Sequence, residues 1–446
     1  MVQTIMSMLD RIDFDQSYQI RFPDGTTYKQ GEDPVFYVHV KTDRALRQIL
    51  REPSMGFGES FMAEELEIEG DLQLFYRLGF IIKSTEVKPG LFESAKFLLG
   101  YFLRRNTKEG SRKNIAAHYD LGNDFYSRWL DREAMQYTCA YYETPRDTLE
   151  QAQLNKIHLV CRKLQLQPGE TVVEAGCGWG GFGLMAAKHY GVKIRSFNIS
   201  REQIAYAREK AERLGVRNVE YVLDDYRNIT ADRRQYDKFV SIGMLEHVGV
   251  ENYGTLYDVI AKSVRPRGLA MVHSISREAA ALTDPWIEKY IFPGSLMPSL
   301  SEMCGPVEVA NRPLHVVDVE NLRYHYALTL DAWASRLESP EHAEAIRAEY
   351  GEAFYRMFRM YLHSSAAGFR WGGIQLYQML LSNGYDNAAP LTRHHYLGLA
   401  APRVNGARNG RAVKKSALKK TARKNGQTAN VGKPAKKAKK KPATAR

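Results

Sequence analysis

One short segment constrains the fold of this chain more than any other: a glycine-rich turn that joins a strand-like run to a helix-like run. Residues 171–174 are Thr-Val-Val-Glu, residues 175–181 are Ala-Gly-Cys-Gly-Trp-Gly-Gly, and helical apolar spacing follows over 182–189. Because glycine lacks a side chain, the backbone can turn sharply there and approach a ligand at the helix N-terminus. The segment therefore predicts a doubly wound α/β domain with a ligand at this turn.

Four more strand-like runs support this prediction. They cover 193–197, 219–223, 238–242 and 269–273, and helix-like stretches cover 201–214 and 253–263. Five strands with helical crossovers predict a mostly parallel sheet, with its ligand crevice at the carboxyl ends of the strands. Aromatic residues after 331 recur near helical spacing, so we expect helices from 331 to 386.

The segments on either side of this domain differ in character. Residues 1–80 alternate short strand-like stretches with turn signals such as Pro23-Asp24-Gly25, which predicts a small α+β domain. Residues 81–113 predict a linker with one amphipathic helix over 91–103, which either docks on the protein itself or lies on lipid headgroups. The α/β domain then occupies 114–390, and a tail covers 391–446.

The tail carries the excess positive charge. Residues 403–446 contain 16 of the 63 Lys and Arg residues and none of the 51 Asp and Glu residues, so the rest of the chain is slightly acidic. A segment rich in Lys, Ala, Gly and Pro buries too little apolar surface to fold, which predicts a disordered polycation from 403. Its expected partner is an anionic membrane surface, or nucleic acid bound nonspecifically; the alternative is a solvated appendage without a partner.

The cysteines and the apolar runs bear on location. Cys139, Cys161, Cys177 and Cys304 form no C-x-x-C pair, so no metal site is predicted, and a reducing, cytoplasmic compartment is the simplest interpretation. The first residues lack the apolar core and cleavage site of a secretory signal. No eighteen apolar residues run together. Membrane contact is therefore expected to be peripheral, at the inner face of the membrane.

Two cofactors compete for the glycine turn. Its G-x-G-x-x-G spacing fits a nicotinamide dinucleotide, but such sites usually have an acidic residue about twenty positions on. Here the second strand-like run ends at Asn198. S-adenosylmethionine fits better, because Glu174 suits its zwitterionic methionine end and two aspartates follow the third strand-like run. A purely structural glycine turn is the remaining alternative.

The chain also resembles a known family, the cyclopropane-fatty-acyl-phospholipid synthases with the related mycolic-acid cyclopropane synthases and lipid methyltransferases. The matching strings are Asn114–Asn123, Tyr137–Tyr141, Val173–Gly181, Gly243–Gly249, Asp284–Pro293 and Tyr326-x-x-Thr329-Leu330-x-x-Trp333. Residues 56–72 resemble the small N-terminal domain of the members that act on phospholipids. The resemblance covers about 15–390 and implies a class I S-adenosylmethionine-dependent methyltransferase fold.

The resemblance implies an activity, methylene transfer from S-adenosylmethionine to the cis double bond of unsaturated phospholipid acyl chains. Methyl transfer leaves a carbocation that water would quench, so the cavity must be dry. A base must then remove a proton so that the ring closes. In this family the base is thought to be a bound bicarbonate ion.

The same motifs imply the site residues. Those that hold bicarbonate are expected to be Cys139, Glu246, His273, the backbone at Ile275, and Tyr326. Those that bind the cofactor are expected to be Tyr137, Thr138, Glu174, Gly176, Gly178, Gly180, Asn198, Gln203 and Tyr226.

Plainer alternatives stay open for these residues and for the function. Cys139 would more often be inert core packing and Glu246 a helix cap, and His247 competes with His273 as the active histidine. The enzyme could instead leave a methyl branch on a lipid or methylate a small molecule. An alternative of another class is a nucleic-acid-binding protein with a degenerate cofactor fold. Monomer and homodimer also both stay open.

Overall fold

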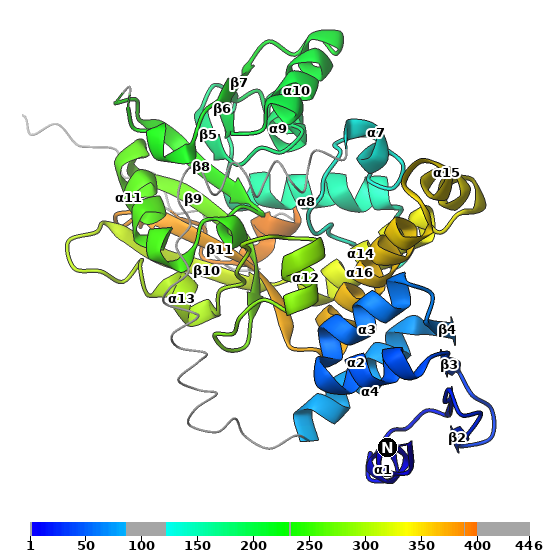
Figure 1. Ribbon diagram of the computed structural model, residues 1–446. Helices are drawn as coiled ribbons and strands as arrows, with labels where there is room; N and C mark the ends of the chain where they lie inside the picture. The colour runs from blue at the N-terminus through cyan, green and yellow to red at the C-terminus, as the bar shows by residue number, and fades with distance from the viewer. Residues whose placement is uncertain (1, 86–121, 232, 388, 399–446) are drawn as a thin grey trace, which may run out of the picture. The chain divides into compact units, whose positions relative to one another are not determined.

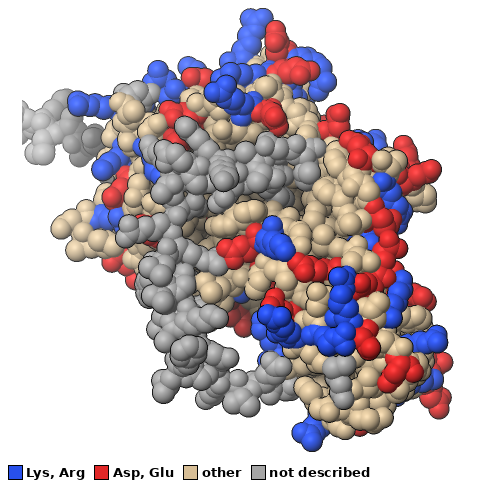
Figure 2. Space-filling view, viewed as in Figure 1, with Lys and Arg blue, Asp and Glu red and all other residues tan. Residues whose placement is uncertain are grey.

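The computed structural model describes residues 2–85, 122–231, 233–387 and 389–398 (Figure 1). Three predicted features lie outside these residues: the linker helix over 91–103, most of the 114–123 motif, and the basic tail from 403. Within the described ranges, no helix is long and apolar enough to cross a bilayer. On the face shown in Figure 2, basic and acidic side chains are interspersed.

The N-terminal residues form their own four-stranded sheet in the order β2-β1-β3-β4. Strand β3 buries alternate side chains, Phe36, Val38 and Val40, as expected of a sheet with one covered face. The small α+β architecture is confirmed. The elements are α1 (Val2–Leu9), β1 (Tyr18–Arg21), β2 (Thr27–Gln30), β3 (Phe36–Val40), α2 (Asp43–Arg51), α3 (Pro53–Met62), β4 (Leu66–Gly70) and α4 (Leu72–Thr85).

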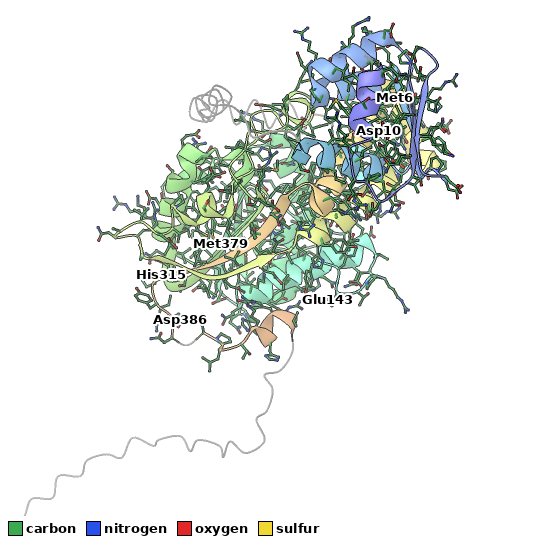
Figure 3. The ribbon with its side chains drawn as sticks, turned by 90° about the horizontal axis from the view of Figure 1, so that it is seen from below. Met6, Asp10, Glu143, His315, Met379 and Asp386 are labelled. Atoms are coloured by element: carbon green, nitrogen blue, oxygen red, sulfur yellow. The ribbon has the colours of Figure 1, made fainter. Side chains whose placement is uncertain are left out.

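The second sheet has seven strands in the order β10-β11-β9-β8-β5-β6-β7. The five predicted strands pair in parallel with one another, which confirms the mostly parallel sheet. Strands β10 and β11 add an antiparallel edge. Figure 3 places His315 of β10 and Asp386, which follows β11, at this edge. The strands are β5 (Thr171–Ala175), β6 (Lys193–Asn198), β7 (Val219–Leu223), β8 (Tyr236–Ile242), β9 (Val264–Arg277), β10 (Leu314–Asn321) and β11 (Ile374–Asn383).

The prediction of helices from 331 to 386 is wrong over β11, and β10 was not predicted. The helical aromatic spacing belongs to α16, which ends at Trp371 before two glycines. Residues 376–381 are then mostly apolar, and such a run fits a helix or a strand covered on both faces equally well. Residues 374–382 pair with β9, so this segment forms a strand and not a helix.

Helices cover both faces of the seven-stranded sheet. Side chains of α8, α9, α14 and α16 share a core with Val172, Met271 and Leu376, whereas α11 and α13 pack against the opposite face with Val173 and Val272. The helices are α7 (Gly122–Ser127), α8 (Leu149–Lys163), α9 (Gly181–Tyr190), α10 (Arg201–Arg213), α11 (Tyr253–Ser263), α12 (Pro285–Tyr290), α13 (Leu300–Cys304), α14 (Arg323–Leu337), α15 (Pro340–Tyr350) and α16 (Glu352–Trp371). Short 3-10 turns are η1 (Tyr226–Asn228), η2 (Leu245–His247), η3 (Val250–Asn252) and η4 (Arg393–Leu397).

Candidate active site

The glycine turn lies at the carboxyl edge of the parallel sheet, between the end of β5 and the start of α9. Gly178 has φ +51°, and a Cβ there would meet no atom within 4 Å, so the backbone faces open space. A Cβ on Gly181 would instead lie 1.9 Å from the carbonyl oxygen of Ala134. One glycine thus exposes backbone to a ligand, and the other allows the preceding loop to pack against the start of α9.

A cleft lies beyond this turn. Its volume is about 1030 Å³ when the open solvent at its mouth is included. We call it the cofactor cleft. Gly180 does not line it; this residue precedes α9, and its carbonyl accepts a hydrogen bond from the Tyr221 hydroxyl at 2.6 Å. The other eight residues expected to bind the cofactor do line it: Tyr137, Thr138, Glu174, Gly176, Gly178, Asn198, Gln203 and Tyr226.

Glu174 is the buried acidic group of the cleft. Ser196 Oγ donates to its Oε2 at 2.6 Å. Burial raises the pKa of Glu174 to about 7, against the opposing effects of that hydrogen bond and of Lys156. A cationic group of a ligand beside Glu174 would favour the ionised carboxylate, because an opposite charge stabilises it.

Two polar groups of the cleft have no hydrogen-bond partner in the described part of the chain. Asn198 Nδ2 donates to Gln203 Oε1 at 2.8 Å and to the Gly178 carbonyl at 3.3 Å, which fixes the amide of Gln203. Gln203 Nε2 and the Tyr226 hydroxyl are then buried without a hydrogen-bond partner among the described residues. Since buried polar groups are nearly always satisfied, these two fit a ligand with several acceptors, such as an adenosyl group.

Other lining residues were not predicted as cofactor ligands. Trp179, within the turn, donates from Nε1 to Asn123 Oδ1 at 2.7 Å, and its place in the glycine string is a usable signal. Met244 lies within the matching string Gly243–Gly249, whereas Gln136 lies outside the matching strings and carries no such signal. His247 also lines the cleft, and burial lowers its pKa to about 4, so it is neutral at physiological pH.

Three of the five residues assigned to bicarbonate lie on segments that adjoin the cleft, since Met244 and His247 line it beside Glu246, and Ile242, which pairs with His273, lines it too. The Ile275 N–H donates to Glu246 Oε1 at 2.6 Å, and His273 precedes Ile275 by two positions on β9. Burial raises the pKa of Glu246 to about 7 and holds the pKa of His273 well below its usual value. Glu246 Oε2 and His273 Nε2 are buried and have no partner in the described part of the chain.

The other two residues lie on neighbouring segments. The Cys139 thiol is fully buried and contacts the Ala140 carbonyl at 3.1 Å, and burial raises its pKa. Tyr326 on α14 stacks on Phe369 with ring centroids 4.4 Å apart. The Ala140 N–H donates to Thr329 Oγ1 at 3.0 Å, which ties the Cys139 loop to α14. None of the five assigned residues lines the cofactor cleft itself.

Lys156 connects these groups and was not predicted. Its ammonium, fully buried on α8, donates to Gln136 Oε1 at 2.6 Å and to Thr138 Oγ1 at 2.8 Å. Burial lowers its pKa to about 8, and its charge acts on Cys139, Glu174 and His273. A positive charge at this position favours anions on the α8 side of the sheet.

Comparison with known proteins identifies the family. The family model described as mycolic acid cyclopropane synthetase matches residues 106–379, and a domain of unknown function (DUF7884) matches residues 5–80. The cyclopropane-fatty-acyl-phospholipid synthase of Escherichia coli K12 is 38% identical over 362 residues, 80% of this chain and 90% of that protein. A probable fatty acid methyltransferase of Pseudomonas putida is 34% identical over 386 residues, 85% of this chain and 94% of that protein.

A solved structure extends the comparison to the cofactor. Mycolic acid cyclopropane synthase CmaA1, complexed with S-adenosylhomocysteine and CTAB, aligns with a TM-score of 0.56 and 30% identity, over 61% of this chain and 98% of that one. The class I S-adenosylmethionine methyltransferase fold is thereby confirmed. With a family model that spans more than half of its residues and a full-length relative at 38% identity, the chain belongs to this family of S-adenosylmethionine-dependent cyclopropane synthases and lipid methyltransferases.

Proposed function

We propose that this enzyme transfers a methylene group from S-adenosylmethionine to the cis double bond of unsaturated acyl chains in membrane phospholipids, which forms cyclopropane fatty acids. The observation that carries the proposal is that two buried atoms, Glu246 Oε2 and His273 Nε2, have no partner among the described residues, and that Glu246 bonds to the Ile275 N–H two positions from His273. Attack of the alkene on the sulfonium methyl group leaves a cation, and closure of the ring from this cation requires loss of a proton to a base. A saturated methyl branch requires a hydride instead, so polar groups that can hold a base suit the loss of a proton.

The residues of the cofactor cleft have separate tasks in this proposal. When bound, S-adenosylmethionine supplies an electrophilic methyl group. Glu174 would pair with its ammonium group, Gly178 would let the backbone approach it, and Gln203 with Tyr226 would donate hydrogen bonds to the adenosyl portion. Since the alkene is a weak nucleophile, the contribution of the chain is alignment and exclusion of water.

The groups on the segments that adjoin the cleft suit a small anion such as bicarbonate. His273, Glu246, Cys139 and Tyr326 would hold it, and its chemistry there would be that of a base for the proton lost on ring closure. At neutral pH much of Glu246 keeps its proton and can donate to an anion. The Ile275 N–H, which the resemblance assigns to the anion, binds Glu246 here and thus positions that carboxyl group.

A second candidate is a methyl-branched lipid product. The relative from Pseudomonas putida is named a probable fatty acid methyltransferase, and it aligns over most of both chains. Both reactions share the methyl transfer and differ in the fate of the cation. The buried Glu246 and His273 favour a product formed by loss of a proton, since both can donate to a bound anion that accepts it. Among such products, the name of the Escherichia coli relative, a cyclopropane-fatty-acyl-phospholipid synthase, favours the ring.

We also propose that the enzyme works in the cytoplasm, at the inner face of the membrane. The substrate lies in the bilayer, and each Lys or Arg near an anionic surface contributes on the order of 1 kcal/mol of binding free energy. The basic residues from 403 onward suit this attraction.

The function is tested by turnover on vesicles. Purified enzyme is incubated with S-adenosylmethionine and vesicles of either cis-monounsaturated or fully saturated phospholipid, and release of S-adenosylhomocysteine is followed. We expect release with the unsaturated vesicles alone. Equal release with both, or with neither while a small amine is methylated, would reject the proposed substrate. The Glu246→Gln variant should bind added S-adenosylhomocysteine with wild-type affinity. In the vesicle assay, however, it should form almost no S-adenosylhomocysteine from S-adenosylmethionine.

A further inference from the structure

A row of polar side chains leads from the surface to His273. Strands β10, β11 and β9 are neighbours in the sheet, and their registers place Glu320 opposite Gln378 and Gln378 opposite His273. Gln378 precedes Met379, which Figure 3 labels on β11. Lys163, at the last position of α8, lies over this row. Lys163, Gln378 and His273 are all about 1% exposed, so the row is closed to water except near Glu320.

The hydrogen bonds in this row have only one consistent direction. Lys163 Nζ contacts Glu320 Oε2 and donates to Gln378 Oε1 at 2.8 Å. An ammonium group has three donors and no acceptor, so the Gln378 oxygen must face Lys163. Its Nε2 then lies 3.2 Å from His273 Nδ1. Because an amide nitrogen only donates, His273 Nδ1 must accept, and it carries no proton.

The carboxylates near Lys163 favour its ammonium form. Burial lowers its pKa, but Glu320 and Asp318 raise it, and Arg393 opposes them. The ring of Tyr396 lies 5.4 Å from Nζ and adds a cation–π contact. At the His273 end of the row, burial and the charges of Lys156 and Lys163 disfavour a charged imidazole.

From this geometry we infer that Lys163 and Gln378 are positioning residues that hold His273 as the neutral imidazole protonated at Nε2. The Nε2–H is thereby a fixed donor at the atom that has no partner among the described residues. The inference rests on the proposed role of His273 in holding a small anion. A ring with its proton on Nδ1 would present a lone pair to that anion and repel it.

Lys163 and Gln378 together select one tautomer of His273, and this task is distinct from packing. If the amide of Gln378 were free to rotate, its oxygen could accept a hydrogen bond from a protonated Nδ1 and stabilise the wrong tautomer. Lys163 prevents this rotation, since a flipped amide would bring its NH₂ group against the ammonium. Loss of either residue should therefore weaken anion binding and leave the cofactor cleft intact.

Nitrogen NMR tests the tautomer without reference to activity. Full-length protein labelled with ¹⁵N-histidine is compared with a His273→Gln variant, which identifies the His273 signals. The wild type should show an unprotonated Nδ1 and a protonated Nε2 throughout pH 6–8. A protonated Nδ1, alone or together with Nε2, would overturn the inference.

Kinetics with defined bicarbonate concentrations test the role. The Lys163→Met and Gln378→Leu variants should each need on the order of tenfold more bicarbonate for half-maximal turnover, because one hydrogen bond to an anion is weakened. Their affinity for S-adenosylhomocysteine should stay at the wild-type value, which also shows that they are folded. The matched control is Gln375→Leu, another buried glutamine of β11, which bonds to Asn321 and Glu278 and should leave the bicarbonate response unchanged.

The outcomes separate the inference from the proposed function. If wild-type turnover does not depend on bicarbonate, the proposed role of bicarbonate as the base is contradicted, independently of the results for the variants. A wild type that depends on bicarbonate, with both variants unchanged in that dependence, would reject the positioning role alone. Equal weakening in the Gln375→Leu control would also reject it, because the effect would then come from strand packing.

Discussion

The buried carboxyl group of Glu246 should reduce the stability of the protein in a pH-dependent manner. Its pKa is raised from 4.5 to about 7 by burial, so the folded state holds this proton more tightly than the unfolded state does. Stability therefore falls as pH rises between these two values and stays low above pH 7. A shift of this size corresponds to about 3 kcal/mol at pH 8 and less than about 1 kcal/mol at pH 5.

The Glu246→Gln variant removes this penalty and keeps the hydrogen bond, since the amide oxygen can still accept from the Ile275 N–H. For a chain of this size the entropy of unfolding is roughly 0.8 kcal/mol/K, so the difference of about 2 kcal/mol equals about 3 °C in Tm. We expect the variant to exceed the wild type in Tm by about 3 °C more at pH 8 than at pH 5.

Differential scanning calorimetry in bicarbonate-free buffer at both pH values measures this effect. Glu69→Gln, which changes an exposed carboxylate of β4, serves as the control and should show no such pH-dependent gain. A Glu246→Gln variant whose Tm difference from the wild type is the same at pH 5 and pH 8 would refute the assigned burial penalty.

Three more changes probe other parts of the structure. Gly181→Ala should lower stability by at least 1–3 kcal/mol because its Cβ meets a backbone oxygen, whereas Gly254→Ala on α11, where space is open, should be neutral or stabilising; equal melting temperatures would contradict this. Lys156→Met leaves Gln136 Oε1 and Thr138 Oγ1 without their donor, so calorimetric titration should show roughly tenfold weaker S-adenosylhomocysteine binding, and unchanged affinity would argue against it. Deletion of 403–446 should weaken binding to anionic vesicles and flatten its salt dependence while turnover on detergent-dispersed substrate persists; unchanged vesicle binding at low salt would reject the membrane role.

The sequence allowed the parallel half of the fold to be predicted closely, because each strand there is followed by a glycine, a cap or a helix with clear apolar spacing. β7 and α11 match their predicted ranges, and β5 and β6 differ by one residue. The antiparallel edge could not be predicted in the same way. The β11 run is apolar on both faces, and only its pairing with β9 decides its conformation.

The cofactor cleft was more predictable than its surroundings. A glycine turn and the polar residues that follow strands mark the carboxyl edge of a parallel sheet, where eight of the nine expected residues lie. Lys156, Lys163 and Gln378 gave no such signal. The two lysines occupy ordinary helical positions, and Gln378 lies in an unpredicted strand, so their burial and mutual contacts emerge only from tertiary packing.

The fate of one carbon atom tests the central proposal most directly. S-adenosylmethionine labelled with ¹³C in its methyl group is incubated with the enzyme and cis-monounsaturated phospholipid vesicles, and the extracted lipid is examined by NMR. We expect the label as a ring methylene within the acyl chain, coupled to two protons. A label found as a methyl branch or an exocyclic methylene, or absent from the lipid, would contradict the proposal.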